Sequence, residues 1–165
     1  MSMVGNLLRV SKTELEDYLN DSSLLEDNIY NEEDDENLNL INIDKAWDGI
    51  IFLLTGQNFM GAASHPLSKI LFSSQLIDEE QDLGYGPAHY LSPEQVKELN
   101  QQISKISETE LAAKYDAKKM AELEVYPEIW DDTNALNYVS DYFKDVQKIY
   151  AEAAENNEAI ITFLN

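Results

Sequence analysis

Two stretches of the chain repeat apolar residues every three or four positions, which predicts two helices that each bury one face. The first stretch carries Val96, Leu99, Ile103 and Ile106. The second, at about 132–156, is the longest helix predicted, and its apolar positions are Leu136, Val139, Phe143, Val146, Tyr150 and Ala153. Both stripes are typical of core packing.

A third predicted helix occupies the segment DKAWDGIIFLLT at 44–55, which is apolar on nearly every side after Gly49. Asp44 is a plausible N-cap, and Gly56 is a favourable residue for the C-terminal end. A helix of this kind packs on several sides, with Trp47 as the expected anchor.

Three hexapeptides share the pattern of a helix start: VSKTEL at 10–15, LSPEQV at 91–96 and ISETEL at 106–111. In each, a serine can accept a backbone N–H three residues later, and a Glu or Gln at that position can return the bond. They follow no fixed period, so they indicate shared capping chemistry rather than a repeat.

Strands are predicted at 3–10, 38–42, 69–72, 87–91 and 159–164, and the last of these, AIITFL, is rich in β-branched and aromatic residues. Helices separate most of these strands. This alternation predicts an α/β fold: a single compact domain over 1–165, with a small sheet flanked by helices.

Charge sets this chain apart: 32 acidic residues against 11 basic ones give a formal net charge of −21. The block EEDDE at 32–36 repels itself, which predicts a solvated acidic loop at about 31–37. Such a field excludes nucleic acid and anionic membranes as partners and favours a basic protein. The alternative is that the acidic composition serves only to keep the protein soluble.

Cysteine is absent from the sequence, so disulfides, thiolate nucleophiles and cysteine metal sites are excluded. The first residues lack a basic segment followed by a long apolar run, and no apolar run approaches a membrane span. We therefore expect a cytoplasmic protein with no cofactor and no metal site.

The segment Gly84-Tyr85-Gly86-Pro87 contains two glycines in a spacing that dinucleotide-binding loops also use. It lacks the third glycine and does not open a helix directly, so it predicts a turn that feeds a strand. Gly84 and Gly86 are expected to supply unusual backbone angles.

The two histidines, His65 and His89, are the candidate acid–base groups. His89 alternates with its neighbours in a predicted strand, so it either faces a cleft or makes a core hydrogen bond. His65 lies in a loop of small residues that a ligand can approach, although no nucleophile motif surrounds Ser64.

The sequence resembles the bacterial YfbM-like family, a domain of unknown function. The resemblance rests above all on IDKAWDGIIFLLTG at 43–56 and DLGYGPAHYLSPEQV at 82–96, and it extends over nearly the whole chain. It implies a compact α/β domain and no established activity.

Two functions therefore remain open. One is a non-catalytic acidic interaction module, of the inhibitor or immunity type, that binds a basic partner. The other is an enzyme or small-ligand-binding domain whose cleft is built around His65, His89 and Trp47. The residues predicted for a ligand or partner site are Asp44, Trp47, His65, Tyr85, His89 and Trp130. The oligomeric state stays open.

Overall fold

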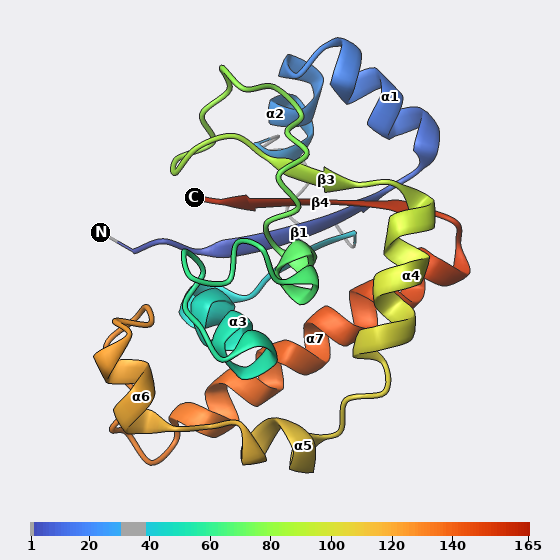
Figure 1. The fold of residues 1–165 in the computed structure, drawn as a ribbon. Helices are drawn as coiled ribbons and strands as arrows, with labels where there is room; N and C mark the ends of the chain where they lie inside the picture. Colours follow the sequence, from blue (N-terminus) through green and yellow to red (C-terminus); the bar gives the residue numbers. More distant parts are fainter. Residues whose placement is uncertain (1, 31–38) are drawn as a thin grey trace.

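A four-stranded antiparallel sheet forms the central layer of the computed structural model, which describes residues 2–30 and 39–165 (Figure 1). Its strands are β1 (Gly5–Val10), β2 (Leu40–Asn42), β3 (His89–Leu91) and β4 (Ala159–Leu164), in the order β2-β1-β4-β3. The two long strands lie in the middle, with Leu8 of β1 opposite Ile161 of β4. The short strands β2 and β3 form the edges.

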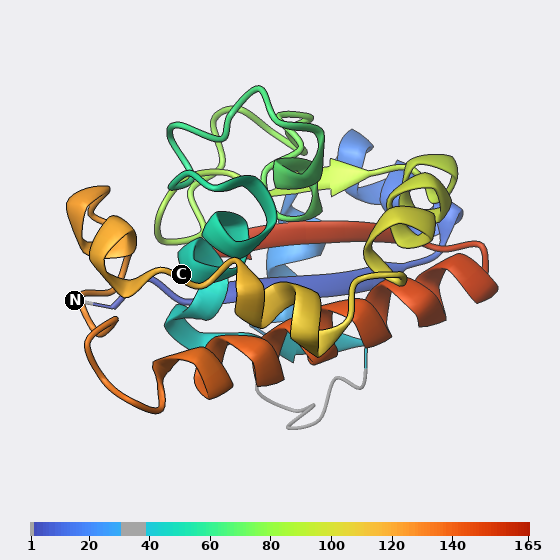
Figure 2. The same ribbon diagram turned by 60° about the horizontal axis from the view of Figure 1, so that its bottom comes forward.

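One face of the sheet is covered by α3 (Trp47–Thr55), α4 (Pro93–Ile103) and α7 (Ala135–Glu155), with α7 running beneath the sheet (Figure 2). Leu7, Leu91 and Ile160 point from three strands into this larger core. They pack with the apolar stripes of α4 and α7, as the period of three and four predicts.

The opposite face carries a smaller core under α1 (Lys12–Asn20), α2 (Ser23–Ile29) and the loop at 77–88. Leu8, Ile161 and Phe163 supply the sheet side, and Leu15 and Leu25 supply the helix side. Because successive residues of β4 point to opposite faces, this one strand joins both cores.

The remaining elements are two short 3₁₀ helices, η1 (Asp44–Ala46) and η2 (Pro66–Ile70), and two short α-helices, α5 (Glu108–Ala113) and α6 (Ala117–Glu122). Helix α5 packs against α7, and α6 lies toward the N-terminal end of α7, both away from the sheet (Figure 1). Within residues 2–30 and 39–165, no helix is long and apolar enough to cross a membrane.

The predicted α/β fold with helices flanking a small sheet is confirmed. Four of the five predicted strands are present, the one at 159–164 with the predicted bounds and the other three in shorter form. The strand predicted at 69–72 is wrong. Pro66 and the His65 cap start a 3₁₀ turn there, and local bonds such as Leu71 N–H to Ser68 O take the place of strand pairing.

The predicted helix starts are confirmed at Ser11, Ser92 and Ser107, each of which accepts a backbone N–H. Ser11 and Ser92 form complete capping boxes. Asp44 is not the cap of the 44–55 helix: it begins η1 with φ +48°, and its carboxylate turns to Tyr138 instead. The predicted acidic loop at 31–37 lies outside the described residues.

Candidate functional site

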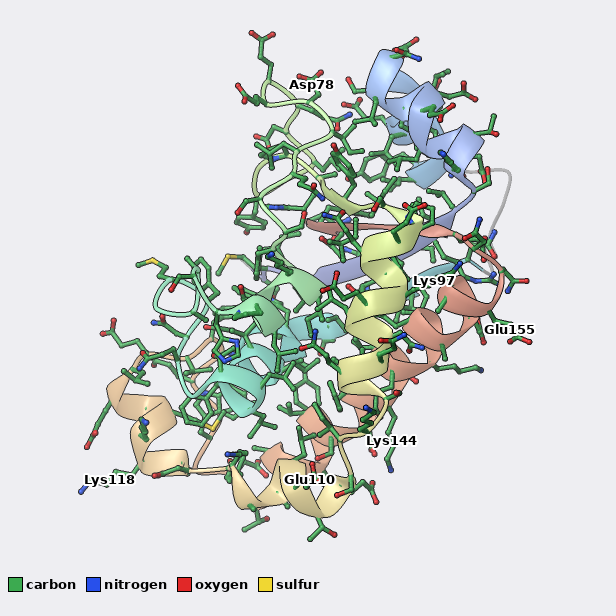
Figure 3. All side chains as sticks on the ribbon, turned by 45° about the vertical axis from the view of Figure 1, so that its right-hand side comes forward. Asp78, Lys97, Glu110, Lys118, Lys144 and Glu155 are labelled. Carbon is green, nitrogen blue, oxygen red and sulfur yellow. The ribbon has the colours of Figure 1, made fainter. Side chains whose placement is uncertain are left out.

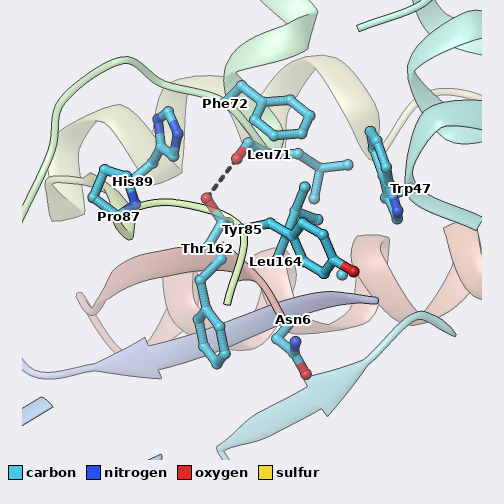
Figure 4. Close-up of a pocket in the computed structure, with 11 residues that line it drawn as sticks. Asn6, Trp47, Leu71, Phe72, Tyr85, Pro87, His89, Thr162 and Leu164 are labelled. Carbon is cyan, nitrogen blue, oxygen red and sulfur yellow. Dashed lines mark hydrogen bonds between the residues drawn. The ribbon is translucent and has the colours of Figure 1, made fainter. Parts of the chain in front are cut away.

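Three of the six predicted site residues, Trp47, Tyr85 and His89, line one cavity of about 30 Å³. The ends of β1 and β4 and the turn after η2 complete its wall (Figure 4). We call this space the aromatic cavity. Its volume holds about one or two water molecules, so in this conformation it does not enclose a metabolite.

His89 sits at one side of the aromatic cavity with its Nδ1 accepting the N–H of Ser74 at 3.0 Å. The ring also meets the edge of Phe72, with centroids 5.7 Å apart. Burial lowers the pKa of His89 below its ordinary 6.5, because the charged form loses hydration. His89 therefore does both things that the sequence left open: it makes a hydrogen bond within the fold, and it lines a cavity.

Trp47 is fully buried and serves as the packing anchor that the sequence predicted. Its ring stacks on Tyr126 and meets the edges of Phe59 and Phe72, with centroid separations of 5.3 to 5.8 Å. Its Nε1–H donates to Met3 O at 2.9 Å. All of its polar capacity is therefore used within the protein.

Tyr85 lies at the tip of the glycine turn, where Gly84 and Gly86 have φ +134° and +99° as predicted. The carboxylate of Asp82 accepts both glycine N–H groups, which fixes the turn and lowers the pKa of Asp82. A Cβ on Gly84 would come within 2.9 Å of the Cα of Asn165. The segment Gly84-Tyr85-Gly86-Pro87 thus packs tightly against the C-terminal residue Asn165.

His65 lines a different and larger hollow, a groove of about 850 Å³ between the C-terminal end of α3 and the segment from α5 to α6. The cleft predicted around His65, His89 and Trp47 is therefore divided: His89 and Trp47 line the aromatic cavity, and His65 does not.

Asp44 and Trp130 lie in neither hollow. Asp44 accepts the hydroxyl of Tyr138 at 2.6 Å, and burial together with this carboxylate raises the pKa of Tyr138. Trp130 is buried, donates its Nε1–H to Val125 O at 2.7 Å, and closes over α3 at Gly49. A Cβ on Gly49 would lie 2.6 Å from the Trp130 ring, so the glycine permits this contact.

Asp48 was not among the predicted site residues, yet it is a buried carboxylate, with 1% of its surface exposed. Its two oxygens accept the N–H groups of Phe59 and Tyr126 at 2.7 and 2.8 Å. Burial raises the pKa of Asp48 to about 6 against the effect of these two bonds. The sequence signal for Asp48 is that a charged residue stands in an otherwise apolar helix segment. That signal does not identify the residues to which Asp48 binds.

An acidic surface is the second feature that the list of site residues missed. It is formed by α1, α2 and the loop at 78–82, and we call it the acidic end. Of its ten carboxylates all but Asp78 are exposed, and Lys12 is the one basic residue in these segments. The ten are Glu14, Glu16, Asp17, Asp21, Glu26, Asp27, Asp78, Glu79, Glu80 and Asp82.

The described residues bring together no group of three His, Cys, Asp or Glu side chains that would hold a metal ion. Among the described residues neither imidazole ring is hydrogen-bonded to a serine hydroxyl; the Nδ1 atom of each accepts a backbone N–H instead. The aromatic cavity offers hydrogen bonding and aromatic contact, and the hollow at His65 adds the charged side chains of Lys114, Asp116 and Lys119.

Fold and surface together define a single α/β domain built on a four-stranded antiparallel sheet between two helical layers. The solved structure of YfbM from Escherichia coli, a protein of unknown function, has the same fold. It superimposes with a TM-score of 0.77 over 98% of this chain and 99% of that one, at 16% sequence identity. No curated protein gives a significant match.

The chain belongs to the family described as a domain of unknown function (DUF1877), whose model matches residues 1–163. The resemblance stated from the sequence is thereby confirmed.

Proposed function

We propose that this protein is a non-catalytic interaction module, of the inhibitor or immunity type, that binds a basic protein through its acidic end. The observation that carries the proposal is the gathering of ten carboxylates from two separate parts of the chain on one end of the molecule. Figure 3 shows Asp78 of the loop beside the exposed side chains of α1.

Hydrogen bonds hold the two parts of the acidic end together. Ser22 Oγ donates to Asp78 at 2.7 Å, and Gln81 Nε2 donates to both Ser22 O and Glu26. The hydroxyl of Tyr30 donates to Leu83 O at 3.0 Å. A surface fixed in this way presents its charges to a partner with little loss of entropy on binding.

Hydrogen bonds help two of these carboxylates, Asp78 and Asp82, to keep their charge in mildly acidic solution. The bond from Ser22 lowers the pKa of Asp78, and the backbone bonds from Gly84 and Gly86 lower that of Asp82. The negative potential would steer a basic partner toward this end.

Exposed apolar side chains accompany the charges. Leu19, Leu24 and Tyr30 are 41%, 43% and 51% exposed on or beside α1 and α2. Interfaces need buried apolar or aromatic contacts for affinity, because charge contributes mainly to association rate and specificity. The acidic end offers both.

The alternative, an enzyme or ligand-binding domain with one cleft around His65, His89 and Trp47, has less support because these residues line separate hollows. We place the proposed interaction in the bacterial cytoplasm, where a protein without cysteine is suited to the reducing environment.

The test uses tagged full-length protein to capture a partner from host lysate at low ionic strength, followed by affinity measurements with the purified partner. The first variant combines Glu16→Lys, Asp27→Lys and Glu79→Lys on the acidic end. The control makes the same charge change elsewhere, with Glu98→Lys, Glu122→Lys and Glu155→Lys, all exposed positions.

We expect the acidic-end variant to bind at least about tenfold more weakly and with a shallower salt dependence, while the control stays close to the original affinity. The proposal fails if no basic protein is retained at low salt, or if the control variant loses as much affinity as the acidic-end variant.

A further inference from the structure

The groove that contains His65 differs in charge from the rest of the molecule. Its wall is formed by Thr55 and Gly56 at the end of α3, by His65, and by residues 113–117 together with Lys119, whereas Lys118 does not line it. Residues 114–119 read KYDAKK, three lysines against one aspartate in a chain of net charge −21. Figure 3 shows α3, α5 and α6 on the same side of the molecule, with Lys118 labelled beside them.

Two lysines, Lys114 and Lys119, line this groove directly. In the described part of the chain, ion pairs within 4.0 Å are formed by Arg9 and Lys144, not by these two. Their ammonium groups are therefore available to a ligand although carboxylates outnumber cations threefold in the sequence.

His65 adds a fixed hydrogen-bond donor to the groove. Its Nδ1 accepts the N–H of Leu67 at 3.1 Å, so the ring proton lies on Nε2. Its backbone is held as well, because its N–H donates to Ala62 O and its carbonyl accepts both the N–H and the hydroxyl of Ser68. The imidazole is thus oriented before any ligand arrives.

Other polar groups of the wall are already engaged. The hydroxyl of Tyr115 donates to Trp130 O at 2.6 Å, and that of Thr55 donates to Ile51 O at 2.7 Å. Asp116 accepts the N–H of Lys119 as the cap of α6. Its negative charge offsets one of the two positive lysine charges in the groove. The donors that remain for a ligand are His65 Nε2–H and two ammonium groups, beside the partly engaged carboxylate of Asp116.

Part of the groove wall is apolar, and it is formed by Phe52, Leu54, Ala113 and Ala117. Its volume of about 850 Å³ is of the size that holds a metabolite. We propose that this groove binds a small organic anion, a carboxylate or a phosphate ester, whose charged group lies between Lys114, Lys119 and His65. The site is on a different surface from the acidic end and does not depend on the proposed function.

Because the chain has two histidines, imidazole NMR signals test this proposal with an internal control. His65 lies in the groove, and His89 lies in the aromatic cavity. The full-length protein is titrated with pyrophosphate in one series and with citrate in another, at constant pH and constant ionic strength. The two series distinguish a phosphate site from a carboxylate site.

We expect a saturable shift of the His65 signal with at least one of the two anions, and no comparable shift of His89. The variant Lys114→Gln/Lys119→Gln should weaken binding at least about tenfold. The control Lys12→Gln/Lys105→Gln, which makes the same charge change at two exposed sites, should bind as the original protein does.

The proposal is overturned if His65 does not shift with either anion at millimolar concentration, or if both histidines shift in parallel. Equal weakening in the two lysine variants would also overturn it, because the anion would then respond to net charge alone.

Discussion

At the scale of single residues, Asp48 is the one fully buried carboxylate among the residues that the structure describes. It lies in the first turn of α3 and joins two loops, at Phe59 and at Tyr126, to that helix. Burial disfavours its charged form, so its pKa is about 6 in the folded protein against 3.8 ordinarily. A carboxyl group with a raised folded pKa stabilises the fold most when protonated, and this contribution is lost as the pH rises through 6.

Asp48 should therefore make the protein more stable as the pH falls. From about pH 7.5 to about pH 5, the free energy of unfolding should gain about 1.4 kcal/mol from this one group. Asp48→Asn, which cannot titrate, should lack this gain. Urea denaturation of both proteins across this pH range measures the difference, with Asp27→Asn as the exposed control.

His89 has the opposite effect on the pH dependence of stability. Because its pKa is lowered in the folded protein, the free energy of unfolding decreases as the pH falls below 6.5. Its contribution is the same in the original protein and in Asp48→Asn, so it cancels in the comparison. A pH dependence identical in the two proteins would show that Asp48 keeps one protonation state throughout.

At the scale of elements, β4 is the strand on which both cores depend. It pairs with β1 along its full length from Ala159 to Leu164 and with β3 from Ile160 to Thr162. Its side chains alternate between the two hydrophobic cores. The composition of this segment predicted a strand, and the structure adds that it lies in the centre of the sheet.

A chain that ends at Asn157 should not fold, because β1 and β3 would lose their shared partner and both cores would lose their sheet side. We expect loss of dispersion in the ¹H–¹⁵N correlation spectrum and loss of cooperative thermal unfolding. Cooperative unfolding in the truncated chain would contradict the central role of β4.

Other elements show where local pattern is enough and where it is not. The capping boxes at Ser11 and Ser92 were predictable because all of their partners lie within three residues. The false strand at 69–72 arose because Ile70 and Leu71 are apolar in either structure, and both are buried in the larger core as part of a 3₁₀ turn and its end. Burial alone does not distinguish the two.

At the scale of the whole molecule, the net charge of −21 is the dominant property. Arg9 pairs with Glu152 and Glu158, and Lys144 pairs with Glu108 and Asp141. Within residues 2–30 and 39–165 these pairs engage Arg9 and Lys144, so repulsion among the other carboxylates opposes the folded state.

Moderate salt should therefore raise the melting temperature. Between about 20 mM and about 300 mM ionic strength the Debye length falls from about 20 Å to about 6 Å, which screens repulsion across the acidic end. A drop in pH toward 6 should act in the same direction. Differential scanning fluorimetry measures both effects, and a melting temperature that stays constant or falls with salt would contradict the expectation.

The acidic-end variant provides a matched comparison, since it removes repulsion in one place. At low salt it should have a higher melting temperature than the original protein. Added salt should raise its melting temperature by less than it raises that of the original protein.

The sequence by itself determined the features that depend on near neighbours: helix starts, the buried stripes of α4 and α7, the glycine turn around Tyr85, and the acidic balance. The tertiary structure alone decided which distant residues meet. It placed His89 with Trp47 and His65 elsewhere, buried Asp48 between two loops, and brought the loop at 78–82 beside α2. These pairings follow from the packing of both faces of one sheet, which no local pattern of residues encodes.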